Sequence, residues 1–228
     1  MEKSTSSSRE IFFVRHAESQ KTLQSRHGGE GLPLTEGGRG DVADLVRFLW
    51  ETEGLQTERV RLFGSSRVQV RETCEIIESL TGAAFSIEPA LRNIHLGVLD
   101  GLSDAEARER YPEVAAALEG WRAGKTKIDS FEIPGAETMR EFYRRVTGFL
   151  RERLRGLEPA VIVGTRSVGV AIANALGSGR HEFEARTYQR FLFDLCSVSK
   201  FRVSGRTSKA LYLNRADFLS RPSLFRDC

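Results

Sequence analysis

The sequence predicts a three-layer α/β sandwich, in which helices flank a mixed and mostly parallel sheet. Short, continuous apolar runs at residues 11–14, 60–63 and 160–163 are typical of strands that are buried on both faces. Segments with helical periodicity lie between these runs, and a hairpin signal follows them near the end of the chain. Strands that alternate with helices pack as a sheet covered by helices, which indicates the fold class.

Three amphipathic helices are expected from apolar side chains that recur at helical spacing. The apolar positions are Val42, Leu45, Val46 and Leu49 in the first, Val70, Cys74 and Ile77 in the second, and Phe142, Val146, Phe149 and Leu154 in the third. The other face of the third helix carries Arg140, Arg144, Arg145, Arg151 and Arg155, which we interpret as a solvated face. Near the end, residues 198–203 and 210–213 flank Ser204-Gly205-Arg206-Thr207, which predicts an antiparallel pair.

Length and composition indicate one globular domain. The chain has 228 residues, of which 40% are hydrophobic and 29% charged. Its net charge is only +3 and its 34 Lys and Arg residues are spread out, which argues against a nucleic-acid partner. The three cysteines have no metal or redox spacing, so we expect reduced thiols in a cytoplasmic protein. Residues 168–177 form the longest mostly apolar stretch, which is too short to span a bilayer, so no membrane partner is expected.

The expected domain covers residues 10–215. Residues 1–9 are predicted to be disordered, and residues 216–228 to form a loose C-terminal tail. Residues 102–131, here called the cap segment, are expected to lie over the pocket as an insert that sets substrate choice. The simpler alternative for this segment is an exposed helix whose acidic and basic side chains pair.

The strongest candidate site follows the first strand, at Arg15-His16-Ala17-Glu18-Ser19. In open α/β folds, ligands bind beyond the carboxyl ends of the strands. An Arg supplies a permanent charge with a donor fork, and a His can act as a nucleophile toward phosphorus. Taken alone, a His at a strand end is more often structural.

Several further motifs, in a fixed order, resemble one family. The RHAES segment is similar to the RHG-type motif of the histidine phosphatase (phosphoglycerate mutase-like) superfamily. The other matching segments are Pro33-Leu34-Thr35-Glu36-Gly37-Gly38, Leu96-Gly97-Val98-Leu99-Asp100-Gly101, Tyr111-Pro112 with Trp121, Pro134-Gly135-Ala136-Glu137-Thr138 and Leu211-Tyr212-Leu213-Asn214. The resemblance covers residues 11–214, and several weak motifs in order seldom coincide by chance.

The resemblance implies a phosphohistidine mechanism without a metal or other cofactor. In the family, the first His attacks the phosphorus, two arginines and a second His surround the phosphoryl oxygens, and a Glu protonates the leaving group. Arg15 and His16 match this pattern as catalytic residues. At the other three core positions, Gln69 replaces an Arg, Asn93 replaces the Glu, and Arg166 replaces the second His.

The replacement at Gln69 is the favoured interpretation of the second arginine. Arg67 and Arg71 lie two residues away on either side, and two residues correspond to about 200° of helical rotation, so neither is expected to point the same way. A shifted helix start could bring Arg71 into place. For the missing acid, His95, Asp100 or Glu18 could substitute, although we interpret His95 as a structural imidazole.

Arg166 is expected to bind an anion, because a cation at a helix start opposes the helix dipole. We therefore expect a small anionic, phosphorylated ligand that is bound by Arg15, Gln69, Arg166, Asn93, Glu18 and Ser19. Arg15, His16, Gln69 and Arg166 should converge on one pocket, with Asn93 at its rim. No metal-ligand spacing is present, so activity should survive chelation.

Three functions remain open at this point, and so does the oligomeric state. The first is a phosphomonoesterase with His16 as nucleophile. The second is a catalytically degenerate member of the family that binds an anionic ligand or a partner without turnover. The third is an enzyme that reuses the pocket for other acid–base chemistry, with His16 as the base.

Overall fold

The computed structural model describes residues 8–24, 26–123, 125–127, 130–177, 179, 182–185, 187–205 and 207–222. Its strands are β1 (Ser8–Arg15), β2 (Arg61–Gly64), β3 (Phe85–Ile87), β4 (Ala160–Gly164), β5 (Val198–Ser204) and β6 (Thr207–Arg215). Its α-helices are α1 (Gln20–Leu23), α2 (Glu36–Arg47), α3 (Val68–Thr81), α4 (Asp104–Arg110), α5 (Pro112–Arg122), α6 (Met139–Glu152) and α7 (Arg166–Gly177). A π-helical turn, η1 (Phe48–Thr52), continues α2, and two 3₁₀ turns are η2 (Pro89–Leu91) and η3 (Gly97–Leu99).

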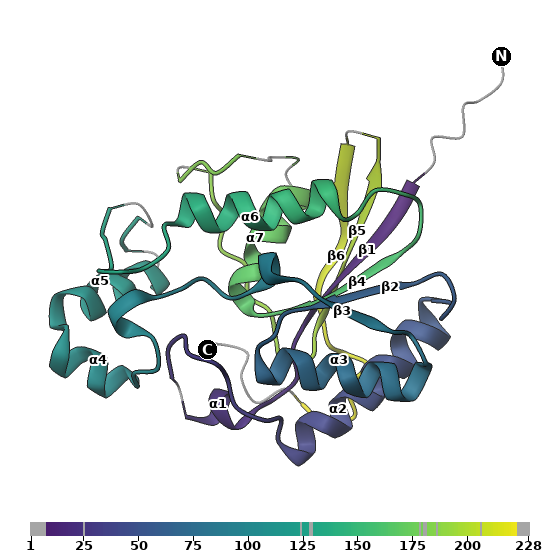
Figure 1. Cartoon of the computed structure of the whole chain (residues 1–228), viewed down its shortest axis with the longest axis horizontal. Coiled ribbons are helices and arrows are strands. Elements are labelled where there is room, and N and C mark those ends of the chain that lie inside the picture. The colour runs from purple at the N-terminus through teal and green to yellow at the C-terminus, as the bar shows by residue number, and fades with distance from the viewer. Residues whose placement is uncertain are drawn as a thin grey trace.

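The strands form one mixed sheet in the order β3-β2-β4-β1-β5-β6. The first three pairings along this order are parallel, and β5 and β6 are antiparallel to their neighbours. Figure 1 shows α6 and α7 on one side of the sheet and α2 and α3 on the other, which confirms the predicted three-layer sandwich. The hairpin expected near the end of the chain is the β5–β6 pair.

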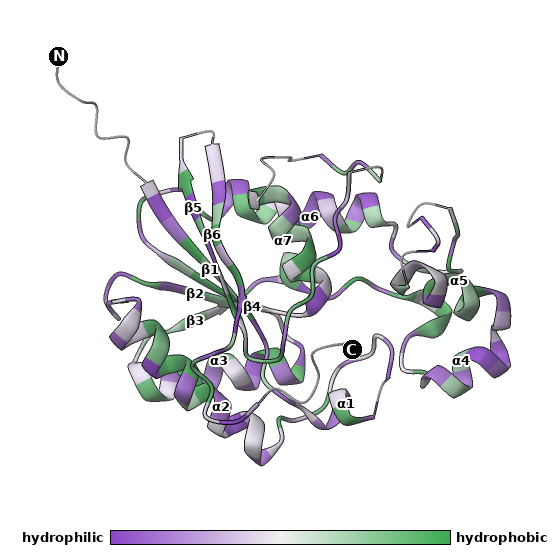
Figure 2. Cartoon of the chain, turned by 180° about the vertical axis from the view of Figure 1, so that it is seen from behind, coloured by the Kyte–Doolittle hydropathy of each residue, from purple (hydrophilic) through white to green (hydrophobic). Residues whose placement is uncertain are grey.

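Alternation along β1 explains why the sheet is covered on both faces. Ile11 and Phe13 belong to the core that α6 and α7 close, whereas Phe12 and Val14 belong to the core that α2 and α3 close. Successive side chains of a strand point to opposite faces, so a continuous apolar run needs a helical layer on each side. The hydropathy colouring shows the apolar residues of these elements turned toward the sheet (Figure 2).

Strand β3 is the one element of the sheet that the sequence patterns miss. It has only three residues, and two of them, Ser86 and Ile87, are exposed at the sheet edge. A strand this short carries neither a buried run nor an alternation that can be recognised.

The cap segment lies beside the sandwich with a small core of its own (Figure 1). Ala107, Ala115 and Leu118 of the cap segment are buried together with Leu99, which lies just before it, and Trp121 packs against these residues. The Ser103 hydroxyl and the Glu106 carboxylate form a reciprocal capping box that starts α4. Two helices too short to be stable alone are therefore held by shared apolar contacts.

The two ends of the chain are described in part. Ser8 and Arg9, placed by the sequence patterns in a disordered start, begin β1, and residues 1–7 lie outside the described part. The predicted tail is anchored over residues 216–222, because the Phe218 ring stacks on Phe48 with centroids 4.4 Å apart. The amide of Ser220 also donates to Asp44 at 2.7 Å. Residues 223–228 lie outside the described part, and no described helix is both long and apolar enough to cross a membrane.

Candidate active site

The backbone after β1 is held by three neighbouring elements. The amide of Arg15 donates to the Ser197 carbonyl at 3.1 Å, and the amide of His16 donates to the Gly164 carbonyl at 3.0 Å. The amide of Ala17 reaches the Thr73 hydroxyl of α3 at 3.3 Å. His16 therefore sits on a fixed backbone at the carboxyl end of the central strand, as expected for an α/β site.

The surroundings of His16 determine which ring nitrogen carries the proton and which charge the ring has. Nδ1 lies 2.8 Å from the Ala17 carbonyl oxygen. That oxygen can only accept a hydrogen bond, so Nδ1 carries the ring proton and Nε2 keeps its lone pair. Burial, followed by the charge of Arg15 and smaller effects of Lys21 and Arg67, lowers the pKa of His16 to about 3. The imidazole is therefore neutral at physiological pH.

Lys21 and Arg67 are site cations that the sequence patterns missed. Both line the same cavity as His16, and both lower its pKa through their positive charge. Lys21 donates to the Gly28 carbonyl and Arg67 to the Gly29 carbonyl. Burial, with a smaller contribution from Arg67, lowers the pKa of Lys21 to about 8. Together with Arg15, these groups give the cavity a positive charge that favours an anion.

Arg67 reaches the cavity because it precedes the helix instead of lying within it. It is the N-cap of α3, with φ −60° and ψ 135°, so the helical rotation assumed from the sequence does not apply to it. The expectation that Arg67 points away from the site is therefore wrong. Arg71 lies inside α3, is about half exposed and pairs with Glu75 at 3.3 Å. The position of Arg67 could have been predicted from the sequence only by placing the start of the helix at Val68, with Arg67 as its N-cap.

Gln69 occupies the cavity wall where the resemblance implies an arginine. Its side chain is buried, and its Oε1 has no hydrogen-bond partner among the described residues. The carboxamide lies against Gly31, whose φ is +97°; a Cβ there would come within 1.9 Å of Oε1. A buried polar atom without a partner costs about 1–3 kcal/mol, so a ligand that donates to it would be favoured.

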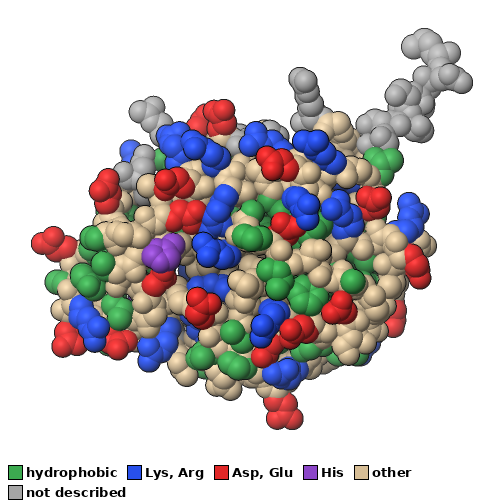
Figure 3. All heavy atoms as spheres, viewed as in Figure 1, with side chains coloured by type: hydrophobic (Ala, Val, Ile, Leu, Met, Phe, Trp, Pro, Cys, Tyr) green, Lys and Arg blue, Asp and Glu red, His purple; other side chains and the backbone are tan. Residues whose placement is uncertain are grey.

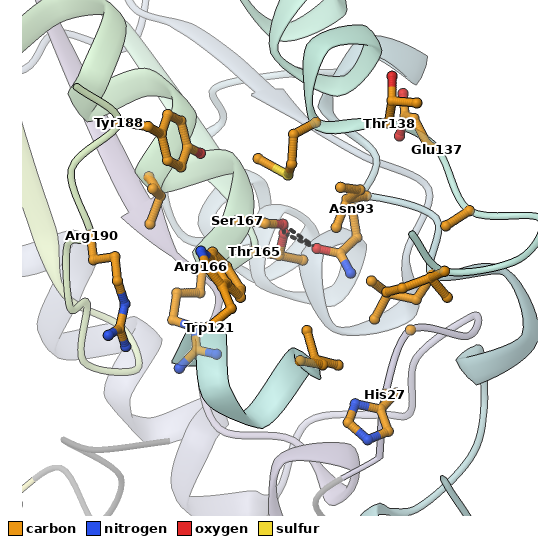
Figure 4. Close-up of a pocket in the computed structure, with 18 of the residues that line it drawn as sticks. His27, Asn93, Trp121, Glu137, Thr138, Thr165, Arg166, Ser167, Tyr188 and Arg190 are labelled. Carbon is orange, nitrogen blue, oxygen red and sulfur yellow. Dashed lines mark hydrogen bonds between the residues drawn. The ribbon is translucent and has the colours of Figure 1, made fainter. Parts of the chain in front are cut away.

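Asn93 is held as a hydrogen-bond acceptor at the opposite wall. Its Oδ1 accepts from the Thr165 hydroxyl at 2.8 Å and also from the Ser167 hydroxyl, as Figure 4 shows. An amide cannot act as a general acid, and this one is already committed to two hydroxyl donors. Asn93, which stands where the family has its acidic Glu, therefore supplies no general acid.

Arg145 positions the loop that carries Asn93. Its guanidinium donates to the carbonyls of Ala90, Arg92 and Asn93 at 2.7, 2.8 and 3.0 Å. It also forms a two-pronged contact with Glu137 at 2.7 and 2.8 Å. The expectation that Arg145 belongs to a solvated helix face is therefore wrong, because tertiary contacts satisfy its donors.

Arg166 begins α7 and lines the cavity. Figure 4 shows its side chain and that of Arg190 extending toward the same part of the cavity. The structure thus brings Arg15, His16, Gln69, Asn93 and Arg166 to one cavity at the carboxyl ends of β1, β2 and β4.

Glu18 and Ser19 are not among the residues that line this cavity. Glu18 accepts from the Thr35 hydroxyl at 2.6 Å and lies 3.4 Å from the Arg221 guanidinium. The Ser19 hydroxyl caps α1 by accepting from the amide of Thr22. Both side chains are buried in contacts that hold the loop after His16, which is why they do not face a ligand.

The cavity has a volume of about 1520 Å³ and combines charged and apolar walls. Much of its aromatic and large aliphatic lining comes from the cap segment, from the residue Ile133 just after it, and from the chain that follows α7: Leu118, Trp121, Phe131, Ile133, Phe183, Tyr188, Phe191 and Leu192. The space-filling view shows Lys and Arg side chains gathered around a hollow on this face (Figure 3). Among the described residues, no three His, Cys, Asp or Glu side chains gather as a metal site.

A neutral histidine beside arginines, at the carboxyl ends of the strands of an α/β sandwich, is typical of the class of proteins that bind phosphoryl groups. Within that class, the chain belongs to the histidine phosphatase superfamily (branch 1), whose family model matches residues 11–216. The resemblance drawn from the sequence motifs is confirmed.

Relatives and solved structures agree with this family. The chain is 31% identical over 198 residues to "Probable phosphoglycerate mutase GpmB" of Photorhabdus laumondii, covering 84% of this chain and 83% of the relative. It is 27% identical over 206 residues to the protein of the same description from Enterobacter sp., with the same coverage.

Among solved structures, the alpha-ribazole phosphatase from Shigella flexneri has a TM-score of 0.72 at 18% identity, covering 91% of this chain and 96% of its own. A mycobacterial glucosyl-3-phosphoglycerate phosphatase in complex with VO3 has a TM-score of 0.73 at 20% identity, covering 90% and 98%. At these identities the two structures show a shared fold.

Proposed function

We propose that the chain is a phosphomonoesterase that transfers the phosphoryl group of a small organic phosphate to Nε2 of His16. The observation that carries this proposal is the state of His16, which is neutral, hydrogen-bonded through Nδ1 and surrounded by cations. A neutral imidazole with its lone pair in a positively charged cavity is suited to attack a dianionic phosphate.

In the first step, Nε2 of His16 forms a bond to phosphorus while the bond to the ester oxygen breaks. The ester oxygen leaves with the electron pair and takes up a proton. In the second step, water attacks the phosphohistidine, which releases phosphate and restores the lone pair of His16. Arg15, Arg67 and Lys21 would hold the phosphoryl oxygens and stabilise their charge in both steps.

The positions that lack the family residues have supporting roles in this scheme. Gln69 and Arg166 would contact the phosphoryl or a neighbouring anionic group, and Asn93 would bind through its amide hydrogens. The scheme requires no metal ion, so turnover is expected to persist in the presence of EDTA.

The cavity volume and its aromatic wall favour an organic phosphate larger than a three-carbon ester. A bare phosphate would fill only a small part of this space. Two structural neighbours, an alpha-ribazole phosphatase and a glucosyl-3-phosphoglycerate phosphatase, have names that are consistent with a bulky phosphorylated substrate.

The experiment that tests the proposal traps the intermediate. Rapid quenching of a reaction with a ³²P-labelled phosphate ester should leave an acid-labile, base-stable phosphoryl adduct, and His16→Ala should abolish it. Turnover that persists in folded His16→Ala would contradict the proposal.

A second function, binding without turnover, is favoured by the hydrogen bonds of Asn93. Its Oδ1 is occupied by two hydroxyl donors, so the family's acid position is catalytically silent. Calorimetric binding of phosphate or vanadate, together with no adduct on His16 and no hydrolysis of any ester, would establish that alternative.

A further inference from the structure

The leaving oxygen in the proposed reaction needs a proton, and most acidic groups that line the cavity are already committed. Both carboxylate oxygens of Glu137 accept from Arg145. Glu184 accepts from the Thr187 hydroxyl at 3.2 Å. Glu132 is exposed at the cavity edge. Of these glutamates, Glu137 is held by Arg145, and Glu132 and Glu184 are exposed, so none of them is a buried carboxyl that takes the place of the family acid.

His27 is a buried imidazole in the same cavity. Its side chain is 5% exposed, and its Nε2 lies 2.9 Å from Asp104 Oδ1, at the first residue of α4. Figure 4 shows His27 on the wall opposite Asn93, Thr165 and Ser167. A carboxylate at this distance accepts a hydrogen bond from Nε2 and thereby orients the ring.

The segment around His27 is fixed to the base of the cap. The amide of His27 donates to the Leu102 carbonyl at 2.8 Å, and the amide of Gly101 donates to the His27 carbonyl at 3.0 Å. Gly28 has a φ of +42°, and a Cβ there would lie 1.4 Å from Asp100 Oδ1. Only glycine fits this close approach, so the position of the imidazole is determined by the fold.

The same segment is tied to the nucleophile's surroundings through Lys21. Its ammonium group donates to the Gly28 carbonyl, and its charge lowers the pKa of His16. The residue after His27 is therefore bonded to a cation that acts on His16. The imidazole of His27 and that of His16 therefore line one cavity and are linked through the same cation.

We propose that His27 donates the proton to the leaving oxygen, with Asp104 as the residue that positions its ring, an inference that rests on the proposed function. As the His16–phosphorus bond forms, the phosphorus–oxygen bond breaks and the leaving oxygen takes the Nδ1 proton of the protonated His27 ring, whose Nε2 stays hydrogen-bonded to Asp104. In the second step, His27 takes that proton back from the water that attacks the phosphohistidine. Protons and electron pairs balance over the cycle, and the products are an alcohol and inorganic phosphate.

The chain contains a matched control for this pair. His95 Nε2 lies 3.0 Å from Asp100 Oδ2, but the His95 side chain is 59% exposed and does not line the cavity. The two pairs share their chemistry and their proximity to the cap, and they differ in access to the ligand.

The test compares two esters in wild type, His27→Gln, Asp104→Asn and His95→Gln. For an alkyl phosphate, His27→Gln should lower kcat/KM by about 10²-fold, and for p-nitrophenyl phosphate by less than about threefold, because nitrophenolate leaves without a proton. Asp104→Asn should show the same dependence on the ester with a smaller loss. His95→Gln should leave both values near wild type. Added imidazole should restore alkyl phosphate turnover in His27→Gly.

Each other outcome has a defined meaning. An equal fall for both esters, the same loss in His95→Gln, or no rescue by imidazole would overturn the role of His27 while leaving His16 as nucleophile. If wild type formed no adduct on His16 and hydrolysed neither ester, both this inference and the proposed function would fail. Thermal melting of each variant checks that the losses come from folded protein.

Discussion

At the residue scale, the charge of the site comes from side chains that lie close in space and apart in sequence. Arg15 ends β1, Lys21 lies in α1 and Arg67 caps α3, yet all three act on His16. Bringing like charges together is unfavourable, and although Asp100 offsets part of the charge of Lys21 and Arg67, an anion bound beside His16 would offset more of it. Their convergence therefore supports a phosphate or another compact anion as the ligand.

Removing Arg67 should weaken catalysis strongly, because a fixed donor to the phosphoryl oxygens is lost. We expect Arg67→Met to lower kcat/KM by about 10²–10³-fold. Arg71→Met is the control, since that guanidinium is exposed and pairs only with Glu75 in the described structure. Steady-state kinetics with p-nitrophenyl phosphate measures both. Equal effects of the two substitutions would show that Arg67 does not contact the phosphoryl group.

The pH dependence should reflect Lys21 and not His16. The pKa of His16 is lowered to about 3, so the nucleophile stays neutral across the range above that value. The pKa of Lys21 is lowered to about 8, so its positive charge is present below pH 8 and is lost as the pH rises through that value. For p-nitrophenyl phosphate, whose leaving group needs no proton from His27, we expect kcat/KM to fall on the alkaline side near pH 8.

The control for this alkaline limb is Lys21→Arg, which keeps a positive charge at all these pH values. In that variant the decrease near pH 8 should disappear. If kcat/KM of Lys21→Arg still fell near pH 8, the decrease would come from the titration of another group.

At the element scale, the loop before the cap depends on one guanidinium of α6. Arg145 binds Glu137 and three backbone carbonyls of the loop at residues 90–93. Its guanidinium also lies 4.8 Å from the centroid of the Phe142 ring. Helix α6 thereby determines where Asn93 stands relative to the start of α7. A site residue is positioned here by a guanidinium that does not itself line the cavity.

Arg145→Met should destabilise the protein by about 3 kcal/mol or more, because Glu137 would be left without its partner and three carbonyls without their donor. Arg144 lies next to it on the same helix and is exposed, so Arg144→Met should change stability by less than about 0.5 kcal/mol. Urea denaturation followed by circular dichroism gives both values. Similar midpoints for the two variants would contradict the role of Arg145.

At the scale of the whole molecule, the distance between the sheet and its helices is set by close contacts at glycines. Gly169 of α7 faces Phe13 of β1, and a Cβ there would lie 2.3 Å from the Phe13 ring. Phe13 is fully buried and also packs edge-on against Phe193, at 5.3 Å between centroids. The close approach of α7 to β1 keeps Arg166, the first residue of α7, near the carboxyl ends of the strands, where His16 lies.

Gly169→Ala should therefore destabilise the fold by about 1–3 kcal/mol through overpacking. Gly148, in the interior of α6, has no atom within 4 Å of an added Cβ, and Gly148→Ala should stabilise the protein by about 0.5–1 kcal/mol. Phe13→Leu should relieve part of the clash, so its effect with Gly169→Ala should be less than additive. Melting temperatures that shift in the same direction for both glycine variants would contradict this packing.

The sequence by itself determined the layered fold, the strand-end position of Arg15 and His16, and the three replaced family positions. A strand that is buried on both faces has a continuous apolar run, and a helix that is buried on one face has apolar residues with a period of 3.6. Both patterns are therefore visible in the sequence without coordinates. The three residues of β3 lie at an edge where burial imposes no such pattern.

Only the tertiary structure decided which cations surround His16 and which side chains support the site. Arg67 depends on where α3 begins, Lys21 on how the loop returns at Gly28, and Arg145 on carbonyls more than 50 residues away in sequence. The same holds for His27 and Asp104, whose 2.9 Å contact joins the first loop to the cap. Long side chains reach their partners through directions set by distant backbone, and no local pattern in the sequence records those directions.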